Sequence, residues 1–212
     1  MADKTNYHHG DLRNALLAAA LDMLETEGLE TLSLRRVAAR VGVSHAAPAH
    51  HFPTLRALFT ALATIGFERF DAAMRAARDA AAHDPASQLR AAGQGYLAFA
   101  EANPALFRLM FTTTRIDWSD PELIAAGDAS YAQLAEVCAP AAEHLGIGDP
   151  EGRAALERLV WSAAHGRAHL AIDGKIPPGA EAPGAIDLTD LLLGRAMAKA
   201  DTPSSSPTSP AP

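Results

Sequence analysis

Residues 33–52 read SLRRVAARVGVSHAAPAHHF, and this stretch decides the fold of the N-terminal part of the chain. Ser33 can cap a short helix over residues 34–41, in which apolar residues share one face and arginines lie on the other. Gly42 can supply the left-handed residue that ends this helix. Ser44 is expected to cap a second helix of about two turns. A short helix, a glycine-containing turn and a second short helix predict a helix-turn-helix.

Pro48 lies inside the second of these helices. With Ser44 as N-cap, it is the fourth helical residue, so it removes the first hydrogen bond of the helix, which would go to the Ser44 carbonyl. Proline in a helix interior costs about 3 kcal/mol, and local 3₁₀ geometry at the first turn reduces that cost. We therefore expect this helix to survive, shortened or slightly bent.

The residues on both sides of this stretch favour helices. Apolar residues recur at helical spacing over about residues 10–27, and Gly28 can end that helix. Thr54 can cap a long helix that reaches about residue 82. Asx-Pro pairs mark further helix starts at residues 84–85, 103–104, 120–121 and 149–150, and a last helix is expected over residues 186–200. The sequence thus predicts an all-α protein.

Composition limits the compartment. The chain has 212 residues and a single cysteine, Cys138, which cannot form an intramolecular disulfide. The N-terminal residues lack the apolar run of a secretion signal. No stretch approaches the roughly 20 apolar residues that span a bilayer. We expect a cytoplasmic protein.

Charge is distributed unevenly along the chain. The net charge of −7 argues against nucleic acid as a partner, because DNA is bound through Lys and Arg. Residues 31–56, however, hold four arginines and no Asp or Glu, a local charge of +4. Three of these arginines lie on the single short helix over residues 34–41, which a buried hairpin would not tolerate. This basic island predicts a DNA-binding module on an acidic body.

The stretch from His8 to Phe70 resembles, in order and spacing, the N-terminal domain of tetracycline-repressor-type (TetR) transcriptional regulators. It covers about a third of the chain. The later W-S-A-A-H-G, residues 161–166, resembles the Trp-His-Gly signature of one class of C-terminal domain in that family. The resemblance implies a homodimer with a four-helix interface, and a core that holds a small effector whose binding releases operator DNA. We expect a repressor.

The candidate DNA contacts lie in and around the helix-turn-helix. They are Thr31, Ser33, Arg35, Arg36, Ser44, His45, Ala46, Ala49, His50, His51, Thr54 and Arg56. Thr31 and Ser33 could instead serve only as local caps. The family commonly has Tyr where this chain has Ala49, and Lys where it has Leu55, so two phosphate contacts are absent. If histidines replace them, operator affinity should depend on pH between about 6 and 8.

A cluster of large side chains in the C-terminal part predicts a pocket for a small apolar ligand. Its candidate residues are Tyr96, Phe99, Phe107, Met110, Phe111, Trp118, Tyr131, Trp161, His165 and His169. The alternative for each of them is an ordinary helical core. Gly93 and Gly95 lie in a predicted helix, which they destabilise by up to about 1 kcal/mol each, and they indicate close approach of a helix or a ligand.

The sequence favours no enzyme, cofactor or metal. His165 and His169 are four residues apart on one helical face, a spacing that can bind zinc, but the Glu of an HExxH site is missing. No catalytic residues are predicted. The rival interpretation is a helical ligand-binding or metal-dependent enzyme that has kept a vestigial DNA-binding domain.

Apolar stripes on the last two helices favour a dimer. The candidate interface residues are Leu156, Leu159, Val160, Ala163, Leu188, Leu191, Leu192 and Met197, and the alternative is burial within one chain. A dimer would place its two reading helices about 34 Å apart on a palindrome. The expected domains are residues 1–53 for DNA, 54–200 for ligand and dimer contacts, and a disordered tail over 201–212.

Overall fold

The computed structural model describes residues 9–112, 114–176 and 188–193, and within them every regular element is helical. In chain order these elements are α1 (His9–Glu27), the 3₁₀ helix η1 (Leu29–Thr31), α2 (Leu34–Val41), the 3₁₀ helix η2 (Ala47–His50), α3 (Leu55–Asp79), α4 (Pro85–Ala102), α5 (Pro104–Met110), α6 (Pro121–His144), α7 (Pro150–Ile172) and α8 (Leu188–Leu192). The all-α prediction is confirmed. The tail over 201–212 and most of the expected last helix lie outside the described residues.

Helix starts follow the local signals of the sequence. Asp84, Asp120 and Asp149 each accept hydrogen bonds from backbone N–H groups in the first turn of the helix that follows. Thr54 caps α3 in the same way. Asn103 differs, because its side chain donates to the Phe99 carbonyl, and the Glu25 carboxylate of α1 instead accepts from the Ala105 and Leu106 N–H groups at the start of α5. Short-range contacts thus cap α3, α4, α6 and α7, whereas α5 is capped from α1.

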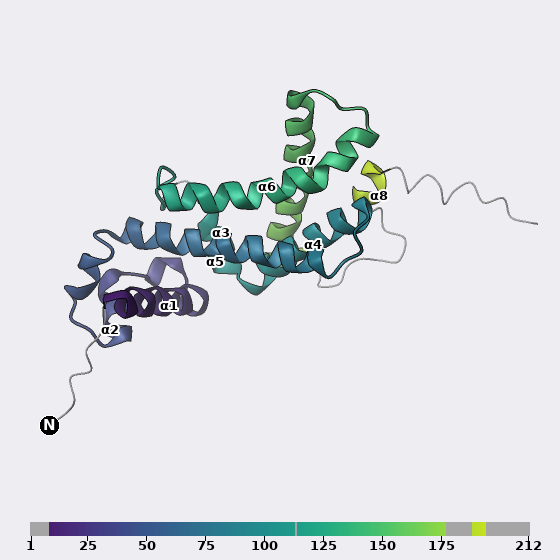
Figure 1. Cartoon of the computed structure of the whole chain (residues 1–212). Coiled ribbons are helices and arrows are strands. Elements are labelled where there is room, and N and C mark those ends of the chain that lie inside the picture. The colour runs from purple at the N-terminus through teal and green to yellow at the C-terminus, as the bar shows by residue number, and fades with distance from the viewer. Residues whose placement is uncertain (1–8, 113, 177–187, 194–212) are drawn as a thin grey trace, which may run out of the picture.

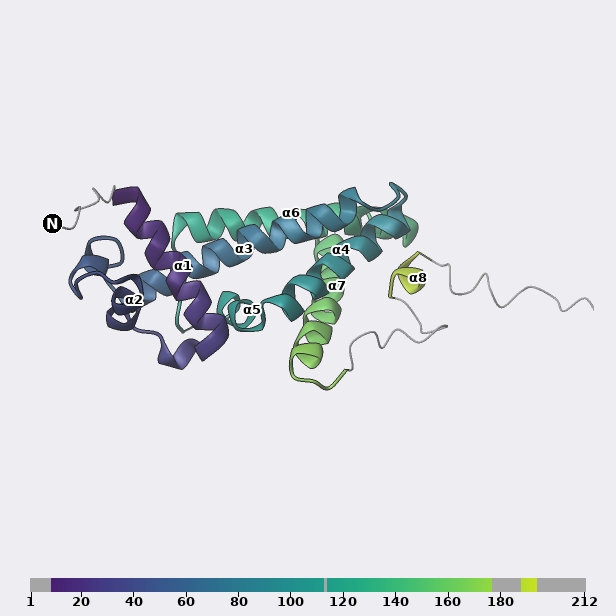
Figure 2. The ribbon, with the colours of Figure 1, turned by 90° about the horizontal axis from the view of Figure 1, so that it is seen from below.

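The elements form a head and a body joined by one long helix (Figure 1). The head consists of α1, η1, α2 and η2 at one end of the molecule. α3 leaves the head and runs through the body, where it packs against α4, α5 and α6. α7 crosses these helices steeply and contacts both α4 and α6 (Figure 2). α3 is therefore the element that the head and the body share.

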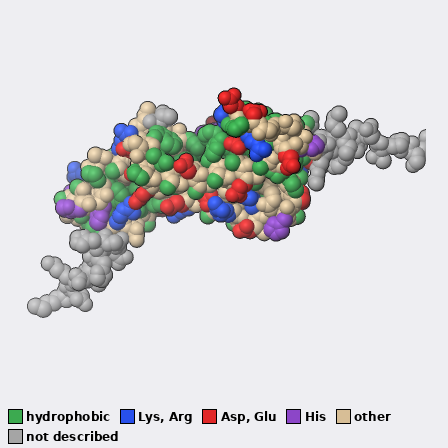
Figure 3. Space-filling view, turned by 45° about the horizontal axis from the view of Figure 1, so that its top comes forward, with side chains coloured by type: hydrophobic (Ala, Val, Ile, Leu, Met, Phe, Trp, Pro, Cys, Tyr) green, Lys and Arg blue, Asp and Glu red, His purple; other side chains and the backbone are tan. Residues whose placement is uncertain are grey.

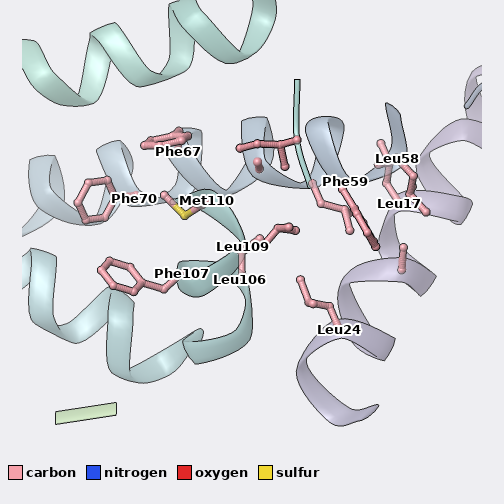
Figure 4. Packing of buried hydrophobic residues seen from close by; sticks show 14 of the residues in the cluster. Leu17, Leu24, Leu58, Phe59, Phe67, Phe70, Leu106, Phe107, Leu109 and Met110 are labelled. Atoms are coloured by element: carbon pink, nitrogen blue, oxygen red, sulfur yellow. The ribbon is translucent and has the colours of Figure 1, made fainter. Parts of the chain in front are cut away.

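One hydrophobic core extends from the head into the body. Leu17 and Leu24 of α1 pack against Leu58 and Phe59 of α3, and the same cluster continues to Phe107 of α5 (Figure 4). A second cluster forms where α6, α7 and α8 meet the start of α4. None of the described helices is long and apolar enough to cross a membrane.

The segment that follows Gly42 is not the expected two-turn α-helix, and that prediction is wrong. Ser44 caps nothing with its side chain, and the chain turns before η2, a 3₁₀ helix whose first turn contains Pro48. Ala47 donates to the Ser44 carbonyl and His51 to the Pro48 carbonyl, both with 3₁₀ spacing. Because proline has no N–H, the α-helical bond from residue 48 to Ser44 is missing, and the tighter helix forms instead.

Candidate functional site

The basic island of the head is partly neutralised by acids on α1. Arg36 donates to the Glu27 carboxylate at 2.5 Å and to the Thr31 carbonyl at 2.8 Å. Arg40 donates to Asp22 at 2.6 Å and also to Glu27. The local count of +4 therefore overestimates the charge that α2 presents, because the acids that pair with Arg36 and Arg40 lie just before residues 31–56. Arg36, expected as a DNA contact, instead ties α2 to α1.

Arg35 remains available on the surface of α2. Its side chain is exposed and forms no hydrogen bond or ion pair with the described residues. Further along the head, Ser44, His45, Ala46, Ala49 and His50 are also exposed, and these six residues define the reading face. Histidine side chains are visible at this end of the molecule in Figure 3, and others lie at the opposite end. Ala49 presents no polar group there, so the reading face carries one arginine and two histidines.

The other candidate DNA contacts are engaged within the chain. Thr31 donates its hydroxyl to the Gly28 carbonyl, and Ser33 accepts from the Arg36 N–H as the N-cap of α2. Thr54 caps α3, and His51 is half-buried behind the reading face. These contacts support the capping role that the sequence left open for Thr31 and Ser33.

Arg56 lies at the junction of the head and the body. Its guanidinium donates to the Ile116 carbonyl from Nε and Nη2, at 3.2 and 3.0 Å, and approaches the Asp117 carboxylate at 3.6 Å. The Asp117 N–H donates to the Thr60 hydroxyl at 2.9 Å. The hydroxyl and N–H of Ser119 hold the pKa of Asp117 below its usual value, and Arg56 adds to this effect. We call these contacts the latch, because they join the start of α3 to the loop between α5 and α6.

The body contains an apolar cavity of about 360 Å³ between α3, α4, α6 and α7. Five predicted residues line it, namely Tyr96, Phe111, Trp118, Tyr131 and Trp161. The other five do not, which is a correction: Phe99, Phe107 and Met110 are core residues, and His165 and His169 are half-buried behind the wall. A volume of this size is typical of small-molecule sites.

Sequence reasoning missed the contribution of α3 and, apart from Tyr131, that of α6. Phe67, Phe70 and Met74 line the cavity from α3, and Asp128 and Gln133 line it from α6. The three α3 residues recur at helical spacing, which signals an apolar face but cannot say whether that face meets protein or empty space.

The two glycines of α4 have different neighbours. A Cβ at Gly95 would lie 2.8 Å from the Ala73 carbonyl oxygen and 2.8 Å from the Met74 Cα of α3. A Cβ at Gly93 would meet nothing within 4 Å, and Gly93 lines the cavity. Gly95 therefore permits close packing of α3 on α4, and Gly93 leaves room beside the cavity.

Tyr96 in the cavity wall forms a hydrogen-bonded pair with His165 behind it. The Tyr96 hydroxyl lies 2.7 Å from Nδ1 of His165. Burial raises the pKa of Tyr96, and burial followed by the neighbouring His169 lowers the pKa of His165. Both groups are thus kept neutral at neutral pH. Among the described residues, no group of three potential ligands is arranged to hold a metal ion.

The proposed dimer residues differ in how far they are buried within the single chain. Leu156, Val160 and Leu192 are buried in the second core cluster, which fits the alternative of burial within one chain. Leu159 and Leu191 are 58% and 56% exposed, and Ala163 is also exposed. Leu188 is half-buried, and Met197 lies outside the described residues. An exposed apolar face therefore remains on α7.

Two family descriptions match the chain. Residues 16–62 match the bacterial regulatory proteins of the tetR family, and residues 89–194 match the tetracyclin repressor-like C-terminal domain. The Trp-His-Gly subclass stays a prediction.

Solved structures and curated proteins agree with these matches. A protein of unknown function from Rhodococcus sp. RHA1 is 33% identical, with a TM-score of 0.70 over 92% of this chain and 96% of that one. The TetR-like regulator LfrR from Mycobacterium smegmatis, solved in complex with proflavine, is 23% identical, with a TM-score of 0.55 over 93% and 98%, and shares the fold. The nucleoid occlusion factor SlmA from Photobacterium profundum is 35% identical over 99 residues, 46% of this chain but only half of that protein.

Proposed function

The chain belongs to the TetR family of bacterial transcriptional regulators, and from this premise we propose that it is a dimeric repressor released from its operator by a small molecule in the cavity. It acts in the cytoplasm on palindromic DNA. Residues 1–53 serve as the DNA-binding domain, and residues 54–200 bind the ligand and the second subunit.

The observation that carries this proposal is the position of α3 between the reading face and the cavity. Leu58 and Phe59 of α3 pack in the core of the head, and Phe67, Phe70 and Met74 of the same helix line the cavity. A ligand that binds one arrangement of the head better than another shifts the population toward it. Because α3 is packed at both ends, a tilt at the cavity must reposition the head.

The latch supplies a second connection between the same two places. The loop between α5 and α6 contributes Phe111 and Trp118 to the cavity wall. The same loop reaches the head through the hydrogen bond from Arg115 to Glu30, at 2.6 Å, and reaches α3 through Arg56. We propose that Arg56 transmits the state of the cavity and does not contact phosphate.

The repressor role is tested by operator binding in solution. Purified protein should select a palindromic sequence from random DNA. Arg35→Ala should make the logarithmic salt dependence of binding shallower by about one for each bound subunit, because one phosphate contact is lost. The measurement is fluorescence anisotropy over a salt series. Arg69→Ala is the matched control, since Arg69 is exposed on α3 away from the head. If the wild type, Arg35→Ala and Arg69→Ala show the same salt dependence of operator binding, the proposed reading face is rejected.

The latch predicts a separable defect in regulation. Arg56→Met keeps the aliphatic packing but removes the donors to Ile116. We expect operator affinity without ligand to stay within about twofold, while the change caused by a releasing compound shrinks several-fold, within the 0.5–2 kcal/mol that such positions contribute. Arg75→Met is the control, because Arg75 pairs only with Asp71 on the surface of the same helix. A large loss of ligand-free affinity would instead identify Arg56 as a DNA contact.

A further inference from the structure

The cavity carries charge at one position. Asp128 of α6 is the one charged side chain among the described lining residues, and none of those residues is Lys, Arg or His. Its carboxylate is exposed and forms no hydrogen bond or ion pair with the described residues. A ligand with a carboxylate or phosphate would therefore meet no opposite charge in this cavity, and would be repelled by Asp128.

The other polar groups of the wall are already hydrogen-bonded within the protein. The Ser130 hydroxyl donates toward the Phe67 and Ala126 carbonyls, and the Gln133 amide donates to the Asp71 carbonyl. The Tyr96 hydroxyl is bonded to His165. These groups offer few partners to a ligand, since using them would break an internal bond. Asp128 is therefore the lining residue whose side chain can accept a hydrogen bond from a ligand without breaking an internal one.

Nearby arginines do not change this balance. Arg78 donates to the Gln133 side chain but is also paired with Glu136 at 3.0 Å. The charge of Arg158 opposes the rise in the pKa of Tyr131, whose hydroxyl donates to Glu157. Neither arginine lines the cavity. Arg78 is balanced locally by Glu136, and because neither arginine lines the cavity, Asp128 remains the charge of its described wall.

Aromatic rings surround the entrance. Trp118, Tyr131 and Trp161 line the cavity and are each about two-fifths exposed, at 42%, 40% and 37%. Deeper in the wall, the Phe67 and Phe111 rings meet edge to face with centroids 5.5 Å apart. Exposed aromatic faces attract cations, and the deeper rings accept a flat apolar body.

We propose that the effector is a hydrophobic aromatic cation, whose ring system packs among Phe67, Phe111 and Trp118 and whose positive group pairs with Asp128. This inference rests on the proposed function, because it names the class of molecule that the regulatory cavity accepts. It excludes organic acids and acyl phosphates as effectors, and it ranks uncharged rings below their cationic analogues.

Three probes of one shape and different charge test the inference. 9-Aminoacridine is cationic at pH 7.5, acridine is neutral and acridine-9-carboxylate is anionic. Dissociation constants are measured by calorimetry with the purified full-length protein. We expect the cation to bind about tenfold more tightly than acridine, and the anion most weakly. Asp128→Asn should reduce the advantage of the cation to about threefold.

Two further variants locate the effect. Glu143→Gln removes the same charge from the far end of α6, about 22 Å along the helix and beyond the screening length, so the ranking should not change. Gly93→Leu places a side chain beside the cavity and should weaken all three probes.

The outcomes separate this inference from the proposed function. Tightest binding of the anion, equal binding of the three probes, absence of saturable binding, or an unchanged ranking in Asp128→Asn would each overturn the assignment. Operator anisotropy on the same protein preparation reports the function independently. Operator binding without the expected charge preference rejects only the effector class, whereas failure to bind any operator rejects the proposed function.

Discussion

Leu159→Glu is expected to make the protein monomeric and to weaken operator binding. Leu159, Ala163, Gly166 and Leu170 recur at helical spacing on the exposed side of α7. If this face meets its copy in a second subunit, the substitution removes about 2 kcal/mol of apolar burial from each subunit. Together these losses raise the dissociation constant of the dimer by about a thousandfold, before the cost of burying a carboxylate is added.

Light scattering coupled to chromatography measures the mass, and anisotropy measures operator affinity. Helix content by circular dichroism should not change, because Leu159 is 58% exposed in the single chain and supports no internal packing. Leu145→Glu is the matched control: Leu145 is 47% exposed but lies at the end of α6, outside this face. A dimer that persists in Leu159→Glu at micromolar concentration would contradict the proposed interface.

Gly95→Ala is expected to destabilise the fold, whereas Gly93→Ala is expected to stabilise it. Both substitutions gain up to about 1 kcal/mol of helix propensity in α4. At Gly95 the added methyl meets backbone atoms of α3 at 2.8 Å, which cannot move without separating the two helices. Overpacking of this kind typically costs 1–3 kcal/mol, more than the propensity gain at its upper end.

Thermal unfolding followed by circular dichroism distinguishes the two variants. A net loss of up to about 2 kcal/mol at Gly95 lowers the Tm by up to roughly 8 °C, and the gain at Gly93 raises it by roughly 2–4 °C. Each variant is the control for the other, since both change glycine to alanine two residues apart in one helix. If the two Tm values shift equally and in the same direction, the close approach of α3 and α4 is not the constraint described.

Helix positions could be predicted from the sequence because their signals are local. The Ser33 side chain accepts a hydrogen bond from the N–H of Arg36, three residues later in the chain. Gly42 adopts a left-handed conformation with a φ of 79°. The Asp-Pro pairs at residues 84–85, 120–121 and 149–150 act over two or three residues in the same way, so no distant contact is needed to place them. The same local argument identifies the hydrogen bond that Pro48 removes. It underestimates the consequence, because a 3₁₀ helix replaces the expected α-helix there.

The cavity could be predicted only in part. Phe111 and Trp118, which the sequence predicts, line the cavity, whereas Phe107 packs in the core although it lies four residues before Phe111. An aromatic residue supplies the same hydrophobic signal in both places. Which of them faces empty space depends on how α3, α6 and α7 cross.

By itself, the sequence determined that this protein is helical, where most of its helices begin, and that its N-terminal part has the order of a helix-turn-helix. Only the tertiary structure decided which charged side chains are left unpaired at the reading face and the cavity, and which glycine allows two helices to pack closely. Glu27 of α1 pairs with Arg36 and Arg40 and leaves Arg35 as the arginine on the reading face. Asp128 is the lone charge among the described residues of the cavity wall, because no Lys, Arg or His of another described helix lines the cavity. Helix caps act within a few residues, whereas ion pairs and the cavity depend on segments that the fold brings together from different parts of the sequence.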